Sequence, residues 1–306
     1  MSNIMSKRMI SALAAAGLVT VAFAQDGQRT VYDLPGDALH PEGIAFDQAS
    51  NSLFVSGAGT GEILRIDRES GEVTSFVPSS GVPFSVLGLE VDAEGRLWAA
   101  GASTGEIRAY NIEDGTQVFN AATGEGGLLN DLTVSSTGDV YVTDSDRPVI
   151  FKISAGSEEA EEWLNWNDGG MDYSEGGNAN GIVITDDDAH LIVAQLRTGQ
   201  LWLVDTATKD VTEIDAGETF PGADGIVLDG HTLYVIQNSA NHVSVVELDE
   251  GLASGSVTGT LTADTFGMPA TGVLLDGELV VVNTQFNALG GEPELPFVLS
   301  VVDVAE

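Results

Sequence analysis

A single pattern of apolar and polar positions recurs six times along the chain. In each copy an opening residue, usually followed by glycine, precedes an alternating apolar segment, a turn and a second apolar segment. The copies open at Glu42, Leu87, Asn130, Asn180, Asp224 and Thr271, at intervals of 43 to 50 residues. A third apolar segment follows in every copy and a fourth in most, such as residues 72–77. This alternation predicts β-strands joined by short hairpins, and no helical periodicity is found beyond residue 24.

Four strands repeated every 40–50 residues are typical of propeller blades. We therefore predict an all-β, six-bladed β-propeller that forms one domain over residues 25–306. The last copy stops soon after its third strand, which leaves an open sheet edge. The segment Thr30–Leu34 can supply the missing strand, so we expect it to close the ring. A double-sheet sandwich, the competing all-β fold, does not explain the period.

The first 24 residues have the pattern of a secretory signal peptide. Lys7 and Arg8 precede an apolar run over residues 9–23, and small residues at positions 22 and 24 form a cleavage pattern. The run is too short for an ordinary membrane-spanning helix. We expect cleavage and export to the periplasm or beyond the cell, with no stable membrane association afterwards. The alternative is an uncleaved membrane anchor.

The charge balance excludes some classes of partner. The chain has 47 Asp and Glu against 11 Lys and Arg, which gives a net charge of −36. Such a chain repels nucleic acid and anionic membrane surfaces, so we expect neither as a partner. A surface solvated in a salty external medium explains the charge, and an acidic partner-binding role is the alternative. Because the sequence has no cysteine, disulfides contribute nothing to stability.

The opening residue of each copy has a particular place in a propeller. The innermost strands line the central channel, so the six opening residues form a ring at one face. Four of the six carry side-chain oxygens: Glu42, Asn130, Asn180 and Asp224. Two carboxylates and two amides suit a hard cation, and Ca²⁺ fits this set better than Zn²⁺ or Mg²⁺. The alternative is a set of polar caps, each hydrogen-bonded to a neighbouring turn.

The ring residues lie in motifs that resemble a known family. The motifs are His40-Pro41-Glu42-Gly43, Leu129-Asn130-Asp131, Ala179-Asn180-Gly181 and Ala223-Asp224-Gly225. In their order and spacing they resemble the senescence-marker-protein/gluconolactonase (regucalcin-like) family and the related paraoxonases and diisopropylfluorophosphatases. The resemblance implies a calcium-dependent hydrolase of lactones, aryl esters or organophosphates. It also implies that the four oxygen-bearing ring residues bind the metal ion and that Asp131 orients them from behind.

Two features depart from the family pattern. The sugar-lactonase branch tends to carry an arginine two residues before its first ring asparagine, where this chain has Leu128. The paraoxonases use a pair of histidines above the calcium ion, whereas only His40 is expected to face the site here. These departures leave the substrate open.

Hydrolysis needs a group that activates water. Asp224 is the first candidate for this base and Glu42 the second, while His40 can assist from the loop before Glu42. A lone histidine in such a loop also has a structural interpretation. A metal ion with open positions would polarise the carbonyl group of the substrate.

Loops that enter the ring face are expected to form the wall of a pocket. The candidate wall residues are Phe84, Tyr173, Phe220, Met268 and Arg147. The apolar ones suit a lactone or ester ring, or they merely pack loops against the blades. The arginine is the only cation expected near the rim, where it can bind a substrate carboxylate or pair with a neighbouring aspartate.

Two classes of function follow. The first is an exported calcium-dependent hydrolase that acts on a small lactone or ester. The second is a non-catalytic propeller that binds a ligand or protein partner and uses calcium as a structural plug. Turnover that is sensitive to a chelator separates the two.

Overall fold

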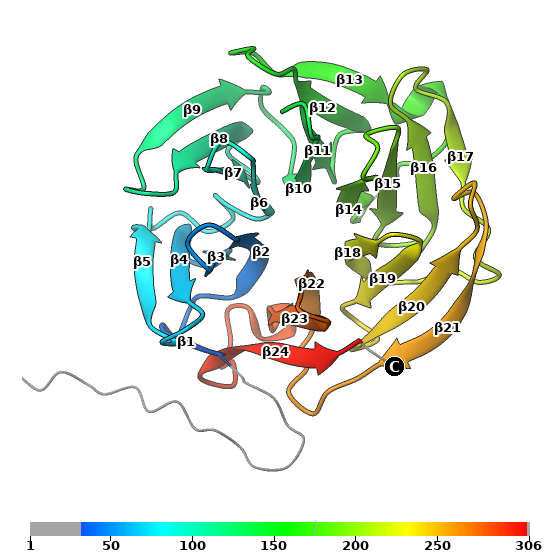
Figure 1. Cartoon of the computed structure of the whole chain (residues 1–306). Helices are drawn as coiled ribbons and strands as arrows, with labels where there is room; N and C mark the ends of the chain where they lie inside the picture. The colour runs from blue at the N-terminus through cyan, green and yellow to red at the C-terminus, as the bar shows by residue number, and fades with distance from the viewer. Residues whose placement is uncertain (1–31, 175, 305–306) are drawn as a thin grey trace, which may run out of the picture.

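A computed structural model describes residues 32–174 and 176–304. Within these residues six antiparallel four-stranded sheets are arranged in a ring around a central axis (Figure 1). The remaining regular elements are two short 3-10 turns, η1 (Trp166–Asp168) and η2 (Phe286–Ala288). The predicted six-bladed β-propeller is confirmed.

The blades are numbered in chain order, and the first strand given for each is the innermost. Blade 1 contains β2 (Pro41–Asp47), β3 (Ser52–Gly57), β4 (Glu62–Asp67) and β5 (Val73–Val77), and blade 2 contains β6 (Leu89–Val91), β7 (Arg96–Ala100), β8 (Glu106–Asn111) and β9 (Gln117–Ala122). Blade 3 contains β10 (Leu129–Val134), β11 (Val140–Asp144), β12 (Val149–Ile153) and β13 (Glu161–Asn165), and blade 4 contains β14 (Ala179–Ile184), β15 (His190–Gln195), β16 (Leu201–Asp205) and β17 (Val211–Glu213). Blade 5 contains β18 (Ala223–Asp229), β19 (Thr232–Gln237), β20 (His242–Leu248) and β21 (Gly255–Leu261), and blade 6 contains β22 (Pro269–Leu275), β23 (Glu278–Asn283), β24 (Phe297–Asp303) and β1 (Tyr32–Leu34).

Neighbouring blades are held together by apolar side chains from their facing surfaces. Between blades 3 and 4, for example, Tyr141 and Trp163 lie in one buried cluster with Ile182 and Trp202. Alternate strand residues point to opposite faces of a sheet, and both faces of each blade meet a neighbour. The second strand of each blade is therefore almost entirely buried and has an apolar centre, such as Leu233–Ile236 of β19. Burial between the blades is what holds the ring together.

The outermost strand of blade 6 comes from the other end of the described chain. β1 pairs antiparallel with β24, with Tyr32 opposite Leu299 and Leu34 opposite Phe297. Leu34 is 1% exposed and lies in the buried cluster shared by blades 6 and 1. The first two residues of the predicted closing segment lie outside the described residues. It stays a prediction that this pairing stabilises the closed ring.

Replacing Leu34 with alanine tests that prediction. Truncating a fully buried leucine typically costs about 2–5 kcal/mol of unfolding free energy, and we expect a loss in this range. Asp33→Ala is the matched control, because Asp33 is exposed in the same strand. Urea unfolding of the two variants measures the difference. Equal stability of the two would show that the short strand contributes nothing to closure.

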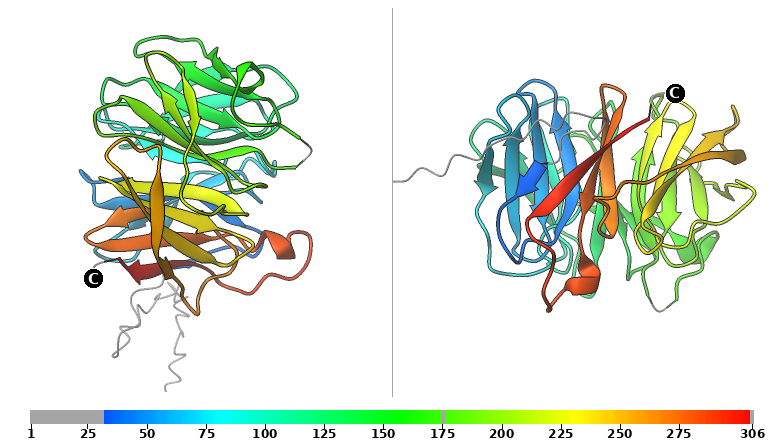
Figure 2. Two further views of the ribbon diagram at one scale, coloured as in Figure 1. Left: turned by 90° about the vertical axis from the view of Figure 1, so that its right-hand side faces the viewer. Right: turned by 90° about the horizontal axis from the view of Figure 1, so that it is seen from below.

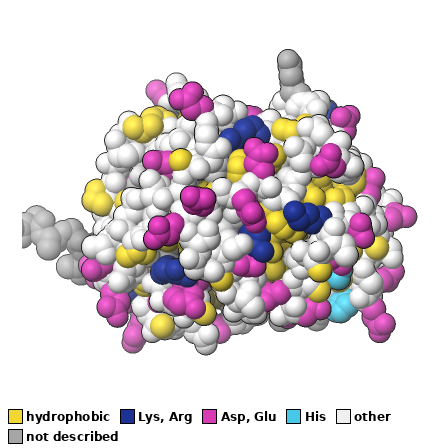
Figure 3. Space-filling view, turned by 90° about the horizontal axis from the view of Figure 1, so that it is seen from above, with side chains coloured by type: hydrophobic (Ala, Val, Ile, Leu, Met, Phe, Trp, Pro, Cys, Tyr) yellow, Lys and Arg dark blue, Asp and Glu magenta, His cyan; other side chains and the backbone are white. Residues whose placement is uncertain are grey.

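The predicted signal peptide, residues 1–24, lies outside the described residues, and export stays a prediction. Among the described residues no helix is long and apolar enough to cross a membrane. The face of the molecule seen in Figure 3 carries many dispersed acidic side chains, with few basic ones between them. This distribution accords with the solvated acidic surface expected from the composition.

Candidate metal and substrate site

A β-bulge at the start of the innermost strand sets the direction of most ring residues. In blade 5 Ala223 pairs with Gln237 and Ile226 with Val235, so the two residues between them oppose a single residue of β19. The same shift of register occurs at the start of β2, β10, β14 and β22. A bulge of this kind bends the strand and changes the direction of a side chain. The four oxygen-bearing ring residues are therefore all bulge residues. In blade 6 the equivalent residue is Ala270, so the predicted ring position Thr271 is one residue too far along the chain.

The four oxygen-bearing ring residues are all buried: Glu42, Asn130, Asn180 and Asp224. Two of their oxygens, Oε2 of Glu42 and Oδ1 of Asn130, are buried without any hydrogen-bond partner in the described structure. A buried polar atom without a partner costs about 1–3 kcal/mol, more when it is charged. These two atoms lie on the inner strands of blades 1 and 3, on either side of blade 2. They indicate a place where a ligand can supply the partners that the protein does not.

Two polar side chains that follow directly after the second strands of their blades orient the ring residues. Nδ2 of Asn130 donates to Oγ of Ser145 at 3.0 Å, and that hydroxyl donates to the carbonyl of Ala179 at 2.7 Å. With its nitrogen held in this way, Asn130 presents its oxygen to the site. In blade 5, Nδ2 of Asn238 donates to Oδ2 of Asp224 at 2.9 Å. Hydrogen bonds of this kind hold a metal ligand in position from outside the coordination sphere.

Blade 3 has Asp131 where blade 6 has Thr271 and the other four blades have glycine. One of its oxygens accepts a hydrogen bond from the backbone of Leu132 at 2.9 Å and the other a long one from Ile182 at 3.4 Å. Gly88 of the neighbouring blade makes room for it, because a Cβ at Gly88 would lie 2.5 Å from Oδ1 of Asp131. The predicted position of Asp131 next to the ring is thus explained by the absence of a side chain at Gly88.

Replacing Gly88 with alanine should therefore disturb the ring. The added Cβ would also lie 2.8 Å from the carbonyl oxygen of Asn130, so backbone has to move. We expect a loss of about 1–3 kcal/mol in unfolding free energy, as in other overpacked sites. Gly251→Ala is the control, since no heavy atom lies within 4 Å of its Cβ position. If urea unfolding shows equal losses for both, the crowding at Gly88 has no energetic importance.

Four acidic groups lie close together around the axis. Burial raises the pKa of Asp224 to about 7, against the effect of hydrogen bonds from Asn238 and Asn180. Burial, and then the charges of Asp224 and Asp131, hold the pKa of Glu42 well above its usual range. Burial also raises the pKa of Asp131 to about 7. Without a cation these carboxylates cannot all be ionised at neutral pH.

Glu90 extends the acidic group along the channel. It lies on β6, and burial followed by the charge of Asp131 raises its pKa to about 8. No ion pair within residues 32–174 and 176–304 reaches any of these four acids. The cost of burying these neighbouring negative charges is reduced either by protonation of the carboxylates or by a bound cation.

The donor set fits Ca²⁺ on these observations. The described residues contain no cluster of three or more His, Cys, Asp or Glu side chains arranged to hold a metal ion. The candidate set has only two carboxylates, Glu42 and Asp224, and two amides complete it. Oxygen-only sets with both kinds of donor suit Ca²⁺, which also accepts backbone carbonyls and water. The orphaned oxygens and the excess of negative charge are what a hard cation would satisfy.

His40 is held in one tautomer by the backbone. Its Nδ1 lies 2.9 Å from the carbonyl oxygen of Thr284, which only accepts, so Nδ1 carries the proton and Nε2 is left as the acceptor. The ring is 4% exposed and packs against Phe286 and Phe297 at centroid distances of 6.2 and 5.1 Å. An oriented imidazole with a free Nε2 suits a proton acceptor, and the same contacts fasten the loop after β23.

Two of the predicted wall residues, Arg147 and Phe220, are engaged in contacts within the fold. Arg147 donates from Nε to Asp144 at 2.7 Å and from Nη1 and Nη2 to Thr123. Its guanidinium also stacks on Phe151 at 4.7 Å from the ring centroid. Phe220 is 2% exposed and lies in the apolar core between blades 4 and 5. Neither residue offers a free group to a ligand, because its contacts within the fold are complete.

The other three wall residues keep accessible surface. Phe84 and Met268 are half-buried, and each has a left-handed backbone, with φ of 52° and 58°. Tyr173 is half-buried and donates its hydroxyl proton to the carbonyl of Asp144 at 2.8 Å. Burial raises its pKa above the usual range, so it stays protonated. These three residues come from the loops before blades 2, 4 and 6, as predicted.

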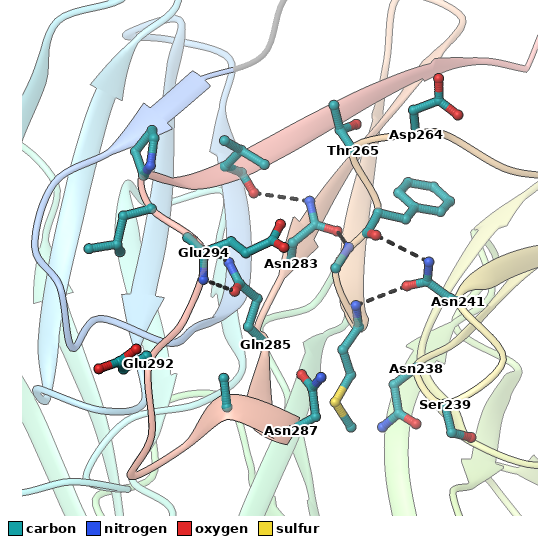
Figure 4. Close-up of a pocket in the computed structure, with 17 residues that line it drawn as sticks. Asn238, Ser239, Asn241, Asp264, Thr265, Asn283, Gln285, Asn287, Glu292 and Glu294 are labelled. Atoms are coloured by element: carbon teal, nitrogen blue, oxygen red, sulfur yellow. Dashed lines mark hydrogen bonds between the residues drawn. The ribbon is translucent and has the colours of Figure 1, made fainter.

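A cavity of about 930 Å³ opens beside Asn238, between blades 5 and 6. In the close-up, Asn241 and Asn283 are tied by hydrogen bonds to the segment before β22, while Asn238, Ser239 and Asn287 lie at the other end (Figure 4). Its size suits a small molecule. Since Asn238 donates to Asp224, this space adjoins the candidate site.

Sequence reasoning missed Ser145, Asn238 and Glu90. Ser145 and Asn238 each follow directly after the second strand of a blade, at equivalent positions in two copies. Tracking this second position through all six copies, as for the first, could have found them. Glu90 lies three residues after the ring position of blade 2, where the other copies have an uncharged residue.

The protein is similar to known proteins in its structure but not detectably in its sequence. No protein-family model and no curated protein matches the sequence. The fold is similar to that of a gluconolactonase from Xanthomonas campestris, with a TM-score of 0.66 and 18% identity over 89% of this chain and 90% of that chain. It is also similar to the major allergen Mala s 1 of Malassezia sympodialis, with a TM-score of 0.69 and 14% identity over 89% and 96%.

A third similar structure is a catalytically inactive virginiamycin B lyase from Staphylococcus aureus. Its TM-score is 0.62, with 14% identity over 90% of this chain and 88% of that chain. Identities this low show a shared propeller fold and nothing finer, because one fold carries many unrelated functions.

Proposed function

We propose that the protein is an exported, calcium-dependent hydrolase of lactones or related esters. The observation that carries the proposal is the pair of buried, unpartnered oxygens on Glu42 and Asn130, beside the raised pKa of Asp224. Glu42, Asn130, Asn180 and Asp224 would hold the ion. A bound Ca²⁺ acts as a Lewis acid that polarises a carbonyl group and stabilises the oxyanion formed on attack.

The chain's own residues supply the proton chemistry. In hydrolysis, the oxygen of water bonds to the carbonyl carbon, the ring C–O bond breaks and the leaving alkoxide oxygen takes up a proton, so that a hydroxycarboxylate and one proton are released. Asp224 is the proposed acceptor of the proton from water, because its carboxylate is buried at the ring beside the place of the ion. Asn238 fixes the orientation of the acceptor by donating to its Oδ2. Glu42 is the second candidate, and His40 can assist through Nε2, because its Nδ1 is held by Thr284.

Assays of a lactone and ester panel test the proposal. We expect purified protein with Ca²⁺ to hydrolyse at least one of γ-butyrolactone, γ-decalactone, D-glucono-δ-lactone and phenyl acetate, and EGTA to reduce that rate at least about 100-fold. Restoring Ca²⁺ should restore the rate, and Mg²⁺ should not, because it demands tighter octahedral geometry. Absence of chelator-sensitive turnover, together with calcium-dependent stability, would instead support the non-catalytic propeller with a structural ion.

A further inference from the structure

The inner face around the ring is apolar on one side. The ring position of blade 2 is Leu87, which is 3% exposed and packs with Ala58 and Ala102. Three half-buried side chains pack on this cluster and keep part of their surface accessible. We call the four larger residues the apolar wall: Phe84, Leu87, Leu128 and Phe286.

Backbone hydrogen bonds fix the apolar wall to the ends of the blades. The amide of Phe84 donates to the carbonyl of Ala58 at 2.7 Å, and the carbonyl of Leu128 accepts from Ser145 at 2.9 Å. The rings of Phe84 and Phe286 lie 5.8 Å apart with a tilt of 44°. Phe286 belongs to η2, which projects with its loop from this face of the propeller (Figure 2). The wall is therefore built on rigid elements, with one side contributed by a projecting loop.

The apolar wall lies between the two residues that carry unpartnered oxygens. Leu87 is next to blade 1, because its carbonyl occupies the space that a Cβ at Gly43 would need. On its other side, Ser145 joins the two features: its amide donates to Leu128 and its hydroxyl accepts from Asn130. A molecule whose carbonyl group reaches a cation held by Glu42 and Asn130 would therefore have Leu128 beside it.

The two arginines on the side of blades 2 and 3, Arg108 and Arg147, are not available to an anionic group. Arg147 is engaged by Asp144 and Thr123. Arg108 donates to Glu106 at 2.7 Å and to the carbonyl of Ser85 at 3.0 Å. A carboxylate or phosphate on the substrate would find no free cation among these groups and would be repelled by the acidic side chains of the ring. The side of the site next to the apolar wall therefore favours an uncharged group.

We propose that the apolar wall binds the alkyl or aryl arm of an uncharged lactone or ester, and that Leu128 sets this specificity. The proposal rests on the proposed hydrolase function and names its substrate class. Burying the arm on the wall removes apolar surface of both from water. A sugar lactone, which carries hydroxyl groups in place of such an arm, leaves that surface without an apolar partner.

A series of γ-lactones with one ring and growing arms provides the test. For γ-butyrolactone, γ-hexalactone, γ-octalactone and γ-decalactone with Ca²⁺ present, kcat/KM should rise about fourfold for each methylene that is buried, until the arm outgrows the wall. Leu128→Ala should reduce the ratio of kcat/KM for γ-decalactone to that for γ-butyrolactone by about tenfold. Leu128→Met, which keeps the volume, should retain most of the ratio. D-Glucono-δ-lactone should be a poor substrate.

Val118→Ala serves as the matched control, since Val118 is an exposed apolar residue on the outer strand β9. It should leave the ratio unchanged, and melting curves verify that each variant is folded. Turnover without dependence on arm length, or an unchanged ratio in Leu128→Ala, would overturn the assignment of the wall while the hydrolase stands. No turnover of any lactone or ester by the unmodified protein would overturn the proposed function, and this inference with it.

Discussion

Replacing Asp224 with asparagine is expected to lower kcat/KM for lactone hydrolysis by at least about 100-fold, the usual scale for loss of a general base. The change removes a charge and a proton acceptor with almost no change of shape. It should also abolish the stabilisation by Ca²⁺, because the ring would then hold a single carboxylate among its four oxygen-bearing side chains. Steady-state kinetics and melting temperatures with and without Ca²⁺ measure the two effects.

Asp229→Asn is the matched control for this prediction. Asp229 is the last residue of β18, the strand that carries Asp224, and it is exposed. Its replacement changes the net charge by the same amount at the opposite end of the strand. We expect kinetics and calcium response close to those of the unmodified protein. If both variants lost activity equally, net charge would explain the effect and Asp224 would have no special role.

Removing Ca²⁺ should make the stability of the protein fall as the pH rises. The folded pKa of Asp224 is about 7, above the ordinary value of about 4 in an unfolded chain. Between these values the folded state keeps a proton that the unfolded state releases. Stability is therefore full below about pH 4 and is lost as the pH rises toward 7. Asp224 alone accounts for roughly 2–3 kcal/mol of this loss between pH 5 and 8.

The neighbouring acidic residues also make the stability of the metal-free protein fall as the pH rises. Glu42 and Asp131 face Asp224 and have raised pKa values, as does Glu90 beside Asp131, while Asn180 and Asn238 oppose the shift by hydrogen bonding. Each of these acids holds a proton in the folded state that a bound cation would replace. Calcium should therefore remove most of the pH dependence above pH 6.

Urea unfolding at pH 5, 6, 7 and 8, with EGTA or with Ca²⁺, measures the effect. A Ca²⁺ concentration 100 times the Kd adds about 2.7 kcal/mol, which corresponds to several degrees in Tm for a domain of this size. Mg²⁺ at equal concentration is the control for ionic strength. A metal-free stability that rises with pH, or identical curves with and without Ca²⁺, would contradict the assignment of the ring as a cation site.

A sequence period of 43 to 50 residues was sufficient to predict the architecture. Alternation of apolar residues defines strands, and equal spacing forces the strands into equivalent blades. The same equivalence identified the ring residues, because residues at one position of a repeat occupy one radius and height in a closed ring. Glu42, Asn130, Asn180 and Asp224 follow from that argument without any knowledge of their contacts.

The repeat period could not predict the burial and the contacts of each side chain. Arg147 is neutralised by Asp144 and held by Thr123, and Phe220 is enclosed by the core, so both dropped out of the predicted pocket wall. Leu128 was recognised only as a departure from a family pattern. The structure adds its neighbours in the apolar wall, which come from other blades.

By itself the sequence determined that six blades form and which residues face their common axis, because hydrophobic alternation and repeat length are local and periodic. The tertiary structure decided which oxygens are left without partners and which wall is apolar. Those outcomes depend on the bulge at Asp224, on the space left by Gly88, and on contacts such as that of Asn130 with Ser145. Burial and hydrogen bonding are properties of the assembled ring, and no single repeat contains them.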